Sequence, residues 1–158
     1  MATIFKNLSQ FSQKNVLDVA QKTFAVIVSE WNTEVTEKLF EGAFQTLVKQ
    51  GAKPENIIRK DVPGSYELSL AAQKMAQIPE IDAVICLGCV IQGETRHFEF
   101  ICQAVAQGLT QVALKYDKPV IFGVLTPDTQ AQALDRAGGK HGNKGDEAAI
   151  TAIKMLSF

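Results

Sequence analysis

Two patterns of hydrophobic positions alternate along the chain: short apolar runs and longer segments with helical spacing. The most informative stretch is residues 81–100, which begins with an almost unbroken apolar run, rich in β-branched residues, over residues 81–91. Such a run is typical of a strand covered on both faces of a parallel sheet. Polarity changes abruptly over residues 92–97, and from Phe98 onward apolar residues recur at helical spacing. The stretch therefore predicts a strand, a glycine-containing loop and a helix.

Three further apolar runs predict the other strands, over residues 23–28, 56–62 and 119–125. Helical spacing follows each strand and predicts helices before Gly51, over residues 66–77, from Phe98, up to Ala137 and toward Leu156. Asn32 or Thr33 suits the N-cap of the first helix, and Thr126 suits that of the fourth.

The alternation of strands and helices predicts an α/β chain, a three-layer αβα sandwich around a four-stranded parallel sheet with order 2-1-3-4. No linker-like segment interrupts residues 23–158, so we expect one domain there. Residues 1–22 are weakly patterned, with Phe5, Leu8 and Phe11 as isolated apolar side chains. They predict an N-terminal arm that a contact outside the domain would order.

Composition and charge narrow the classes of partner. The chain has 158 residues, of which 46% are hydrophobic, and a formal net charge of −1. This is enough apolar material for one sizeable core. A chain so close to neutral lacks the long-range attraction that nucleic acid or an anionic membrane requires, so we expect neither partner. The sequence displays neither a secretory signal nor a membrane-spanning run, which predicts a cytoplasmic protein.

The cysteines predict buried, reduced thiols without disulfides, because Cys86, Cys89 and Cys102 all lie within apolar patterns. Cys86 and Cys89 have the C-x-x-C spacing of a redox pair. Such a pair needs an exposed thiolate at a helix N-terminus, whereas these two lie inside the apolar run. We expect no metal site, because His97 and His141 lack suitably spaced cysteine or carboxylate partners.

Aromatic, charged or hydrogen-bonding side chains accompany each predicted strand, although a simple connection would not need them. In open parallel sheets ligands bind outside the carboxyl ends of the strands, so we expect residues from several loops to converge on one rim. Trp31 and Tyr66 suit stacking on a planar heterocycle, with Glu67 fixing its edge. The alternatives are that Trp31 caps the core and that Glu67 is a first-turn carboxylate favoured by the helix dipole.

Two segments suit an anion. Residues 92–97 lead into a helix and offer backbone N–H groups, and His97 beside them suits general acid–base catalysis. The alternative for His97 is an exposed helix histidine without a catalytic role. Arg136, Lys140, His141 and Lys144 lie close together among glycines. Glycines let a backbone approach a ligand, and clustered cations suit a phosphate; the alternative is a solvated loop.

Five motifs in one order carry a resemblance to a known family. They read WN (Trp31-Asn32), VPGSYEL, GCVIQGETRHFEF, PVIFGVLT and RAGGKHGNKG, between about residue 23 and the C-terminus. With them the chain resembles the 6,7-dimethyl-8-ribityllumazine synthase family. The resemblance implies a flavodoxin-like fold and a transferase of riboflavin biosynthesis. The implied reaction condenses 5-amino-6-(D-ribitylamino)uracil with 3,4-dihydroxy-2-butanone 4-phosphate to 6,7-dimethyl-8-ribityllumazine, phosphate and water, without a metal or organic cofactor.

The resemblance also implies roles for individual residues. His97 matches the proton-transfer residue. The positions that match substrate-binding residues are Trp31 on the pyrimidine, Ser65, Tyr66 and Glu67 on the ribityl chain, Cys89, Val90 and Ile91 at the pyrimidine edge, and Phe122 in the pocket wall. The positions that match phosphate-binding residues are Glu94, Thr95, Arg136 and Lys144. Cys89 departs from the threonine or other small residue of many relatives. Glu94 requires its backbone N–H, and not its carboxylate, to face the phosphate.

The resemblance further implies a homopentamer with active sites between neighbouring subunits. Each site would combine side chains of two chains: Phe122, Arg136 and Lys144 from one, and Trp31, Tyr66 and His97 from the next. The N-terminal arm would then join the sheet edge of a neighbour. The short loop over residues 138–145 favours assembly of pentamers into an icosahedral 60-subunit shell, with a free pentamer as the alternative. Association with riboflavin synthase is a further implied partnership.

Two other functions fit parts of the sequence. A non-catalytic flavodoxin-like module that holds a flavin or another heterocycle would use Trp31 and Tyr66 but gives no reason for His97 and Arg136. A purely structural shell protein would need the interfaces but not the chemistry of the rim. Formation of fluorescent lumazine from the two substrates distinguishes the enzyme from both.

Overall fold

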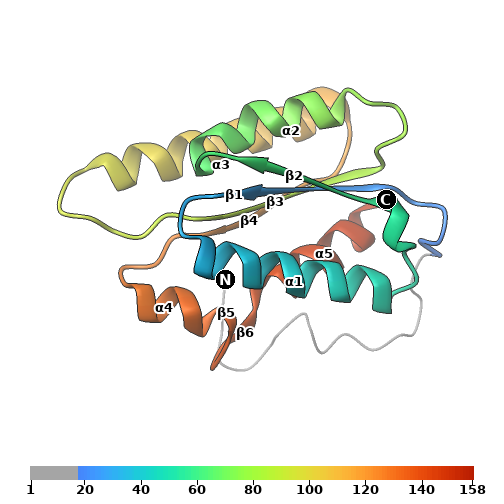
Figure 1. The fold of residues 1–158 in the computed structure, drawn as a ribbon. Coiled ribbons are helices and arrows are strands. Elements are labelled where there is room, and N and C mark those ends of the chain that lie inside the picture. Colours follow the sequence, from blue (N-terminus) through green and yellow to red (C-terminus); the bar gives the residue numbers. More distant parts are fainter. Residues whose placement is uncertain (1–17) are drawn as a thin grey trace.

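A four-stranded parallel sheet forms the centre of the computed structural model, which describes residues 18–158 (Figure 1). Its strands are β1 (Phe24–Ser29), β2 (Ile57–Val62), β3 (Ala83–Cys89) and β4 (Val120–Leu125). Their order is β2-β1-β3-β4, so the predicted order and the α/β class are confirmed. The central strands β1 and β3 are buried along their whole length, as expected of a sheet covered on both faces.

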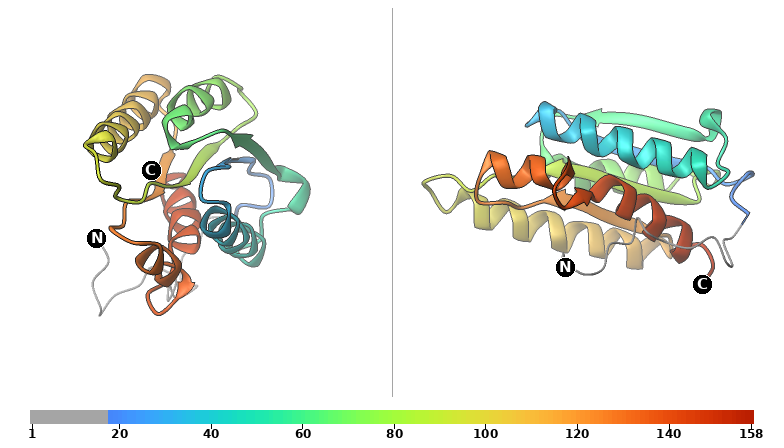
Figure 2. Two further views of the ribbon diagram at one scale, coloured as in Figure 1. Left: turned by 60° about the vertical axis from the view of Figure 1, so that its left-hand side comes forward. Right: turned by 90° about the horizontal axis from the view of Figure 1, so that it is seen from below.

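Helices cover both faces of this sheet. On one face lie α1 (Thr33–Lys49), α4 (Gln130–Asp135) and α5 (Lys144–Met155), and on the other lie α2 (Leu68–Ala76) and α3 (His97–Tyr116) (Figures 1 and 2). Alternate residues of β1 pack into the two hydrophobic cores on opposite faces of the sheet. Phe24, Val26 and Val28 belong to the core beneath α1 and α5, whereas Ala25 and Ile27 belong to the core beneath α2 and α3.

The short elements lie in the connections. Two 3-10 turns, η2 (Pro54–Asn56) and η3 (Ser65–Glu67), flank β2, and a hairpin of β5 (Ala137–Gly139) and β6 (Gly142–Asn143) precedes α5. The sequence pattern predicted a plain loop at this hairpin. None of the helices within residues 18–158 combines the length and the apolar composition that crossing a bilayer demands. Phe5, Leu8 and Phe11 lie outside the described residues, so the contact of the N-terminal arm remains a prediction.

The fold itself requires the glycines around the hairpin, whereas the sequence suggested that they let a ligand approach the backbone. Gly138 and Gly142 have φ angles of 106° and 74°, a left-handed backbone that a side chain strains. Gly145 lies against α1, where an added Cβ would be 1.9 Å from the carbonyl oxygen of Leu39. The glycine density therefore arises from the turn and from helix packing. It does not by itself indicate close approach of a ligand.

The α4 start differs from the predicted cap, and at the α1 start the predicted cap residue uses its side chain elsewhere. Thr129, and not Thr126, is the N-cap of α4, and its Oγ1 accepts a hydrogen bond from the Gln132 backbone N–H at 3.2 Å. Asn32 occupies the N-cap position of α1 but makes no side-chain capping bond. Its Nδ2 instead donates to the Cys89 carbonyl oxygen at 2.8 Å, because the loop after β1 lies against the end of β3.

The cysteines are free thiols, with Cys86 and Cys89 buried in β3 and Cys102 half-buried in α3. Burial raises the pKa of the Cys86 thiol far above its usual value and raises the pKa of Cys89 to about 12. The pKa of Cys102 is raised for the same reason. All three thiols therefore stay protonated at neutral pH. Cys86 and Cys89 are residues of a buried strand and lack the exposed thiolate that a redox pair needs.

The Gly145→Ala substitution should lower the free energy of unfolding by about 2–3 kcal/mol, because its Cβ would overlap the backbone of α1. Urea unfolding followed by circular dichroism measures the change. Gly93→Ala is the matched control, since no atom lies within 4 Å of the added Cβ, and it should change stability by less than about 0.5 kcal/mol. Equal stability of both variants would contradict the tight contact between α1 and α5.

Thiol labelling tests the assignment of Cys86 and Cys89. Native protein treated with a thiol reagent at pH 8 should leave both residues unmodified, because burial keeps the thiols protonated and inaccessible. Unfolding in guanidinium should expose every cysteine. Mass spectrometry of the labelled peptides measures the reaction at each position. Fast labelling of Cys89 in the native protein, or a Cys86–Cys89 bridge, would contradict the assignment.

Candidate functional site

The carboxyl ends of β1, β2 and β3 surround a pocket of about 650 Å³, which we call the aromatic pocket. It contains the residues that the sequence placed at the rim after these three strands: Trp31, Ser65, Tyr66, Glu67, Cys89, Val90, Ile91 and His97. Parallel pairing explains the gathering. Ser29 at the end of β1 is in register with Val62 at the end of β2, so the loops that follow start side by side.

The aromatic rings of this pocket face outward. Trp31 is 74% exposed and Tyr66 is 57% exposed, so the alternative that Trp31 caps the core is wrong. The Trp31 backbone N–H donates to the Pro63 carbonyl oxygen at 3.2 Å, which ties the loop after β1 to the loop after β2. A flat, exposed indole on an anchored backbone can stack on a planar ligand.

The wall of the aromatic pocket contains a hydroxyl without a partner. Ser65 is 6% exposed, and its Oγ makes no hydrogen bond within the described part of the chain. A Cβ added at Gly88 would lie 2.6 Å from this oxygen, so Gly88 leaves the space that Ser65 occupies. Leaving a buried hydroxyl unpaired costs about 1–3 kcal/mol. A small rotation that pairs Ser65 with a ligand hydroxyl would therefore be favourable.

His97 lies at the mouth of the aromatic pocket as the first residue of α3. The side chain is exposed, and its backbone N–H lies 3.4 Å from Thr95 Oγ1. The loop before it is anchored at its start, because the Gln92 backbone N–H donates to the Pro127 carbonyl oxygen at 2.9 Å. His97 can therefore exchange protons with a ligand in the pocket and with solvent.

Glu94 and Thr95 are exposed in this loop and line neither of the two pockets described here. Their backbone N–H groups precede the N-terminus of a 20-residue helix, where the helix dipole favours an anion. Within one chain, the structure does not bring Glu94 and Thr95 together with Arg136 and Lys144 in a pocket.

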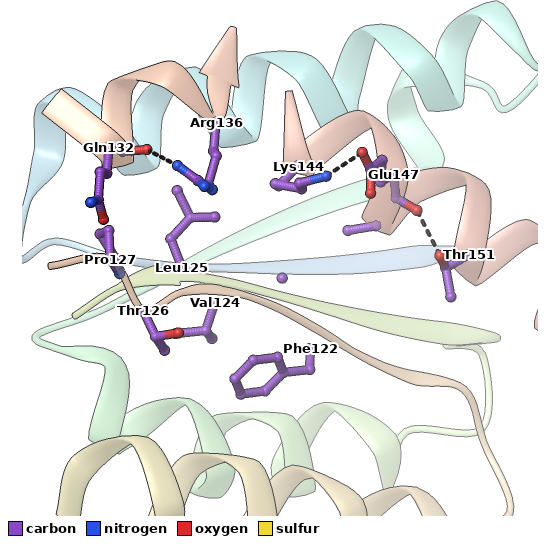
Figure 3. Close-up of a pocket in the computed structure, with 12 residues that line it drawn as sticks. Phe122, Val124, Leu125, Thr126, Pro127, Gln132, Arg136, Lys144, Glu147 and Thr151 are labelled. Atoms are coloured by element: carbon purple, nitrogen blue, oxygen red, sulfur yellow. Dashed lines mark hydrogen bonds and ion pairs between the residues drawn. The ribbon is translucent and has the colours of Figure 1, made fainter. Parts of the chain in front are cut away.

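A second pocket, of about 480 Å³, lies along the edge strand β4, between Gln132 and Arg136 at α4 and the first turns of α5; we call it the arginine pocket. Figure 3 shows Arg136 and Lys144 on its helical side and Phe122 on its strand side. Arg136 donates one hydrogen bond, from NH1 to the Gln132 carbonyl oxygen at 2.9 Å. Arginine carries five N–H donors, so most of this guanidinium can serve an anionic ligand.

Lys144 is held in this pocket by a carboxylate. Its ammonium pairs with Glu147 one turn along α5, and Thr151 Oγ1 donates to the Glu147 backbone carbonyl at 2.7 Å (Figure 3). Sequence reasoning missed Glu147, although its spacing of three residues from Lys144 on a helix is a recognisable signal for an ion pair. The net charge of the arginine pocket therefore comes mainly from Arg136.

The two pockets share no lining residue. Within a single chain, the residues that follow the four strand ends therefore divide between two pockets. Residues after β1, β2 and β3 line the aromatic pocket. Residues of β4, which is at the edge of the sheet, line the arginine pocket. The aromatic pocket has rings, an unpaired hydroxyl and a histidine but no arginine or lysine, whereas the arginine pocket has two cations and no histidine.

Over residues 18–158, the His, Cys, Asp and Glu side chains form no cluster of three or more that could bind a metal ion. The chemistry that the side chains offer is stacking, hydrogen bonding, proton transfer and anion binding.

Comparison with known proteins identifies the family. A model of the 6,7-dimethyl-8-ribityllumazine synthase family matches residues 21–158. A protein of that name from Cytophaga hutchinsonii is 60% identical over 157 residues, which cover 99% of this chain and 98% of the relative. Another from Parabacteroides distasonis is 54% identical over 158 residues, covering 100% of this chain and 99% of the relative. With matches along almost its whole length, the chain belongs to the 6,7-dimethyl-8-ribityllumazine synthase family.

Proposed function

We propose that this chain is a transferase that forms 6,7-dimethyl-8-ribityllumazine in the penultimate step of riboflavin biosynthesis. Its substrates are 5-amino-6-(D-ribitylamino)uracil and 3,4-dihydroxy-2-butanone 4-phosphate. One observation carries the proposal: in a member of this family, exposed rings with a histidine line one pocket and two cations line the other. These are the groups that a flat pyrimidine and a phosphorylated ketone require.

The pyrimidine substrate binds in the aromatic pocket. The Trp31 indole stacks on its ring, which the 74% exposure of this side chain supports. The edge of the ring lies against Cys89, Val90 and Ile91, which line the pocket where β3 ends. The ribityl hydroxyls bind the segment of Ser65, Tyr66 and Glu67, where the unpaired Ser65 hydroxyl and the Glu67 carboxylate provide partners.

The phosphate of the second substrate binds Arg136 and Lys144, with Phe122 as the apolar wall beside them. Arg136 supplies a bidentate fork, and Lys144 a point charge fixed by Glu147. The backbone N–H groups at Glu94 and Thr95 complete the cradle from the other half of the site. Such a cradle stabilises phosphate as it leaves.

Proton transfers connect the steps of the reaction. The 5-amino group attacks the ketone carbonyl and water leaves as the imine forms. Loss of a proton and of phosphate then gives an enol, which tautomerises to a ketone. The second amine attacks that ketone, and loss of water closes the ring. His97 gives and takes the protons, because its exposed imidazole lies at the mouth of the pocket and can both donate and accept a proton. Fixed pairing of the two substrates supplies much of the remaining acceleration.

The active site is shared between neighbouring chains of a homopentamer. Phe122 is 44% exposed on the edge strand, which leaves the arginine pocket open for a neighbour's aromatic pocket. The N-terminal arm covers a sheet edge of the adjacent subunit. Pentamers assemble further into an icosahedral 60-subunit shell, which can associate with riboflavin synthase. The free, protonated thiols suit a reducing cytoplasm.

An Arg136→Ala variant should lower kcat/KM for the phosphate substrate about 100-fold, because it removes the main unpaired positive charge of the arginine pocket. His97→Ala should lower kcat about 100-fold, with residual turnover from the pairing of substrates. Lumazine fluorescence above the spontaneous rate measures both effects.

Lys140→Ala and His141→Ala are the controls for these variants, since neither residue lines a pocket described here. Both should retain wild-type rates. An Arg136→Ala variant with wild-type kinetics would reject the phosphate role. Absence of lumazine formation by the wild-type protein would reject the proposed function itself.

Mixed oligomers test the sharing of the site. Coexpressed Arg136→Ala and His97→Ala chains should regain activity, because about a quarter of the interfaces in a random mixture combine two intact halves. Mixed Arg136→Ala and Lys144→Ala chains are the control, since every arginine pocket then carries a defect. Activity of the first mixture equal to the mean of its two parents would contradict a site between chains.

A further inference from the structure

Asn32 has an unusual backbone at the edge of the aromatic pocket. Its φ and ψ angles are 62° and 44°, in the left-handed region. Among residues 18–158, only Asp117 shares a positive φ without being glycine. This conformation costs most side chains about 1–2 kcal/mol, and asparagine tolerates it better than most. The strain lies directly after Trp31, where the chain turns from the end of β1 into α1.

The side chain of Asn32 is diverted from its helix to the neighbouring strand. Its backbone carbonyl accepts bonds from the Val35 and Thr36 N–H groups at 2.8 and 3.1 Å, so α1 starts there normally. Its Nδ2, which does not cap the helix, donates to the Cys89 carbonyl oxygen at 2.8 Å, 57 residues away in sequence. That carbonyl belongs to the last residue of β3, which is also the first residue of the proposed pyrimidine edge.

Trp31 is consequently fixed from two sides. Its own N–H bonds to the Pro63 carbonyl at 3.2 Å, and the Glu30 N–H bonds to the Val62 carbonyl at 2.8 Å. On the other side, the Asn32 side chain joins the loop to Cys89 at the end of β3. The indole itself stays 74% exposed, so these backbone anchors, and not core packing, determine where the ring stands.

We propose that Asn32 is a positioning residue for substrate binding: its left-handed backbone and its bond to Cys89 hold the Trp31 ring at a fixed angle over the end of β3. The inference rests on the proposed function for its kinetic consequence. Asn32 acts through Trp31 and through the Cys89 carbonyl, which its amide keeps occupied. Losing the bond should therefore weaken binding of the flat pyrimidine and leave the phosphorylated ketone unaffected.

Three substitutions separate the two contributions. Asn32→Gly keeps the left-handed backbone and loses the hydrogen bond. Asn32→Asp keeps the shape and the backbone preference but replaces the donor with a carboxylate that repels the Cys89 carbonyl. Asn32→Ala loses both. Trp31 is the single tryptophan, so its fluorescence anisotropy and its quenching by acrylamide report on this ring without any substrate.

We expect lower anisotropy and faster quenching in all three variants, with the largest effect in Asn32→Ala. KM for the pyrimidine substrate should rise about 10-fold, in line with the loss of one hydrogen bond, while kcat and KM for the phosphorylated ketone change less than about twofold. Asp117→Ala is the matched control. It removes the other left-handed side chain, at the C-cap of α3, and should lower stability without changing Trp31 fluorescence or either KM.

Wild-type anisotropy, or a wild-type KM for the pyrimidine, in folded Asn32→Gly and Asn32→Asp variants would overturn the proposal. So would variants whose only change, as in Asp117→Ala, is lower stability. The fluorescence measurement needs no turnover. Failure of the proposed function, seen as a wild-type protein that forms no lumazine, is therefore distinguishable from failure of the positioning role.

Discussion

The parallel pairing of four strands in the order β2-β1-β3-β4 is the constraint on which the site depends. Because β1 and β3 are central and buried, the loops after β1, β2 and β3 must emerge beside one another. The edge strand β4 has a neighbour on one side only, and Phe122 is left half exposed there. The sheet therefore separates the ring-binding chemistry from the cations within each chain. This separation is the reason that we propose a site between neighbouring chains.

Hydrogen bonds between loops fix the strand ends in place. The Val90 N–H donates to the Leu125 carbonyl at 2.8 Å, and the Gln92 N–H donates to the Pro127 carbonyl at 2.9 Å, which joins the end of β3 to the loop after β4. The Asn32 amide joins the same strand end to the loop after β1. Exposed side chains can thus keep defined positions, because the backbone beneath them is bonded on both sides. The site is preorganised at the level of the backbone.

The sequence pattern predicted those features that depend on local apolar character. Buried strands read as unbroken apolar runs, so β1, β3 and the strand order followed from the pattern and the resemblance. Asn32 is the N-cap residue of α1, as the pattern allows, but the partner of its side chain, Cys89, is 57 residues away and cannot be found by local reasoning. The glycines around the cation cluster suggested close approach of a ligand, but Gly145 is required by its contact with the Leu39 backbone, which only the packed helices reveal. The division of the site into two pockets likewise depends on which strand is at the edge.

A structure of the assembled protein with phosphate and a non-reactive ribitylaminopyrimidine analogue would show whether the site lies between two chains. We expect the pyrimidine on Trp31 of one chain, with the phosphate on Arg136 of its neighbour and His97 beside the reacting atoms. Both ligands bound within a single chain, or Trp31 and the neighbouring Arg136 on unrelated surfaces, would contradict this arrangement.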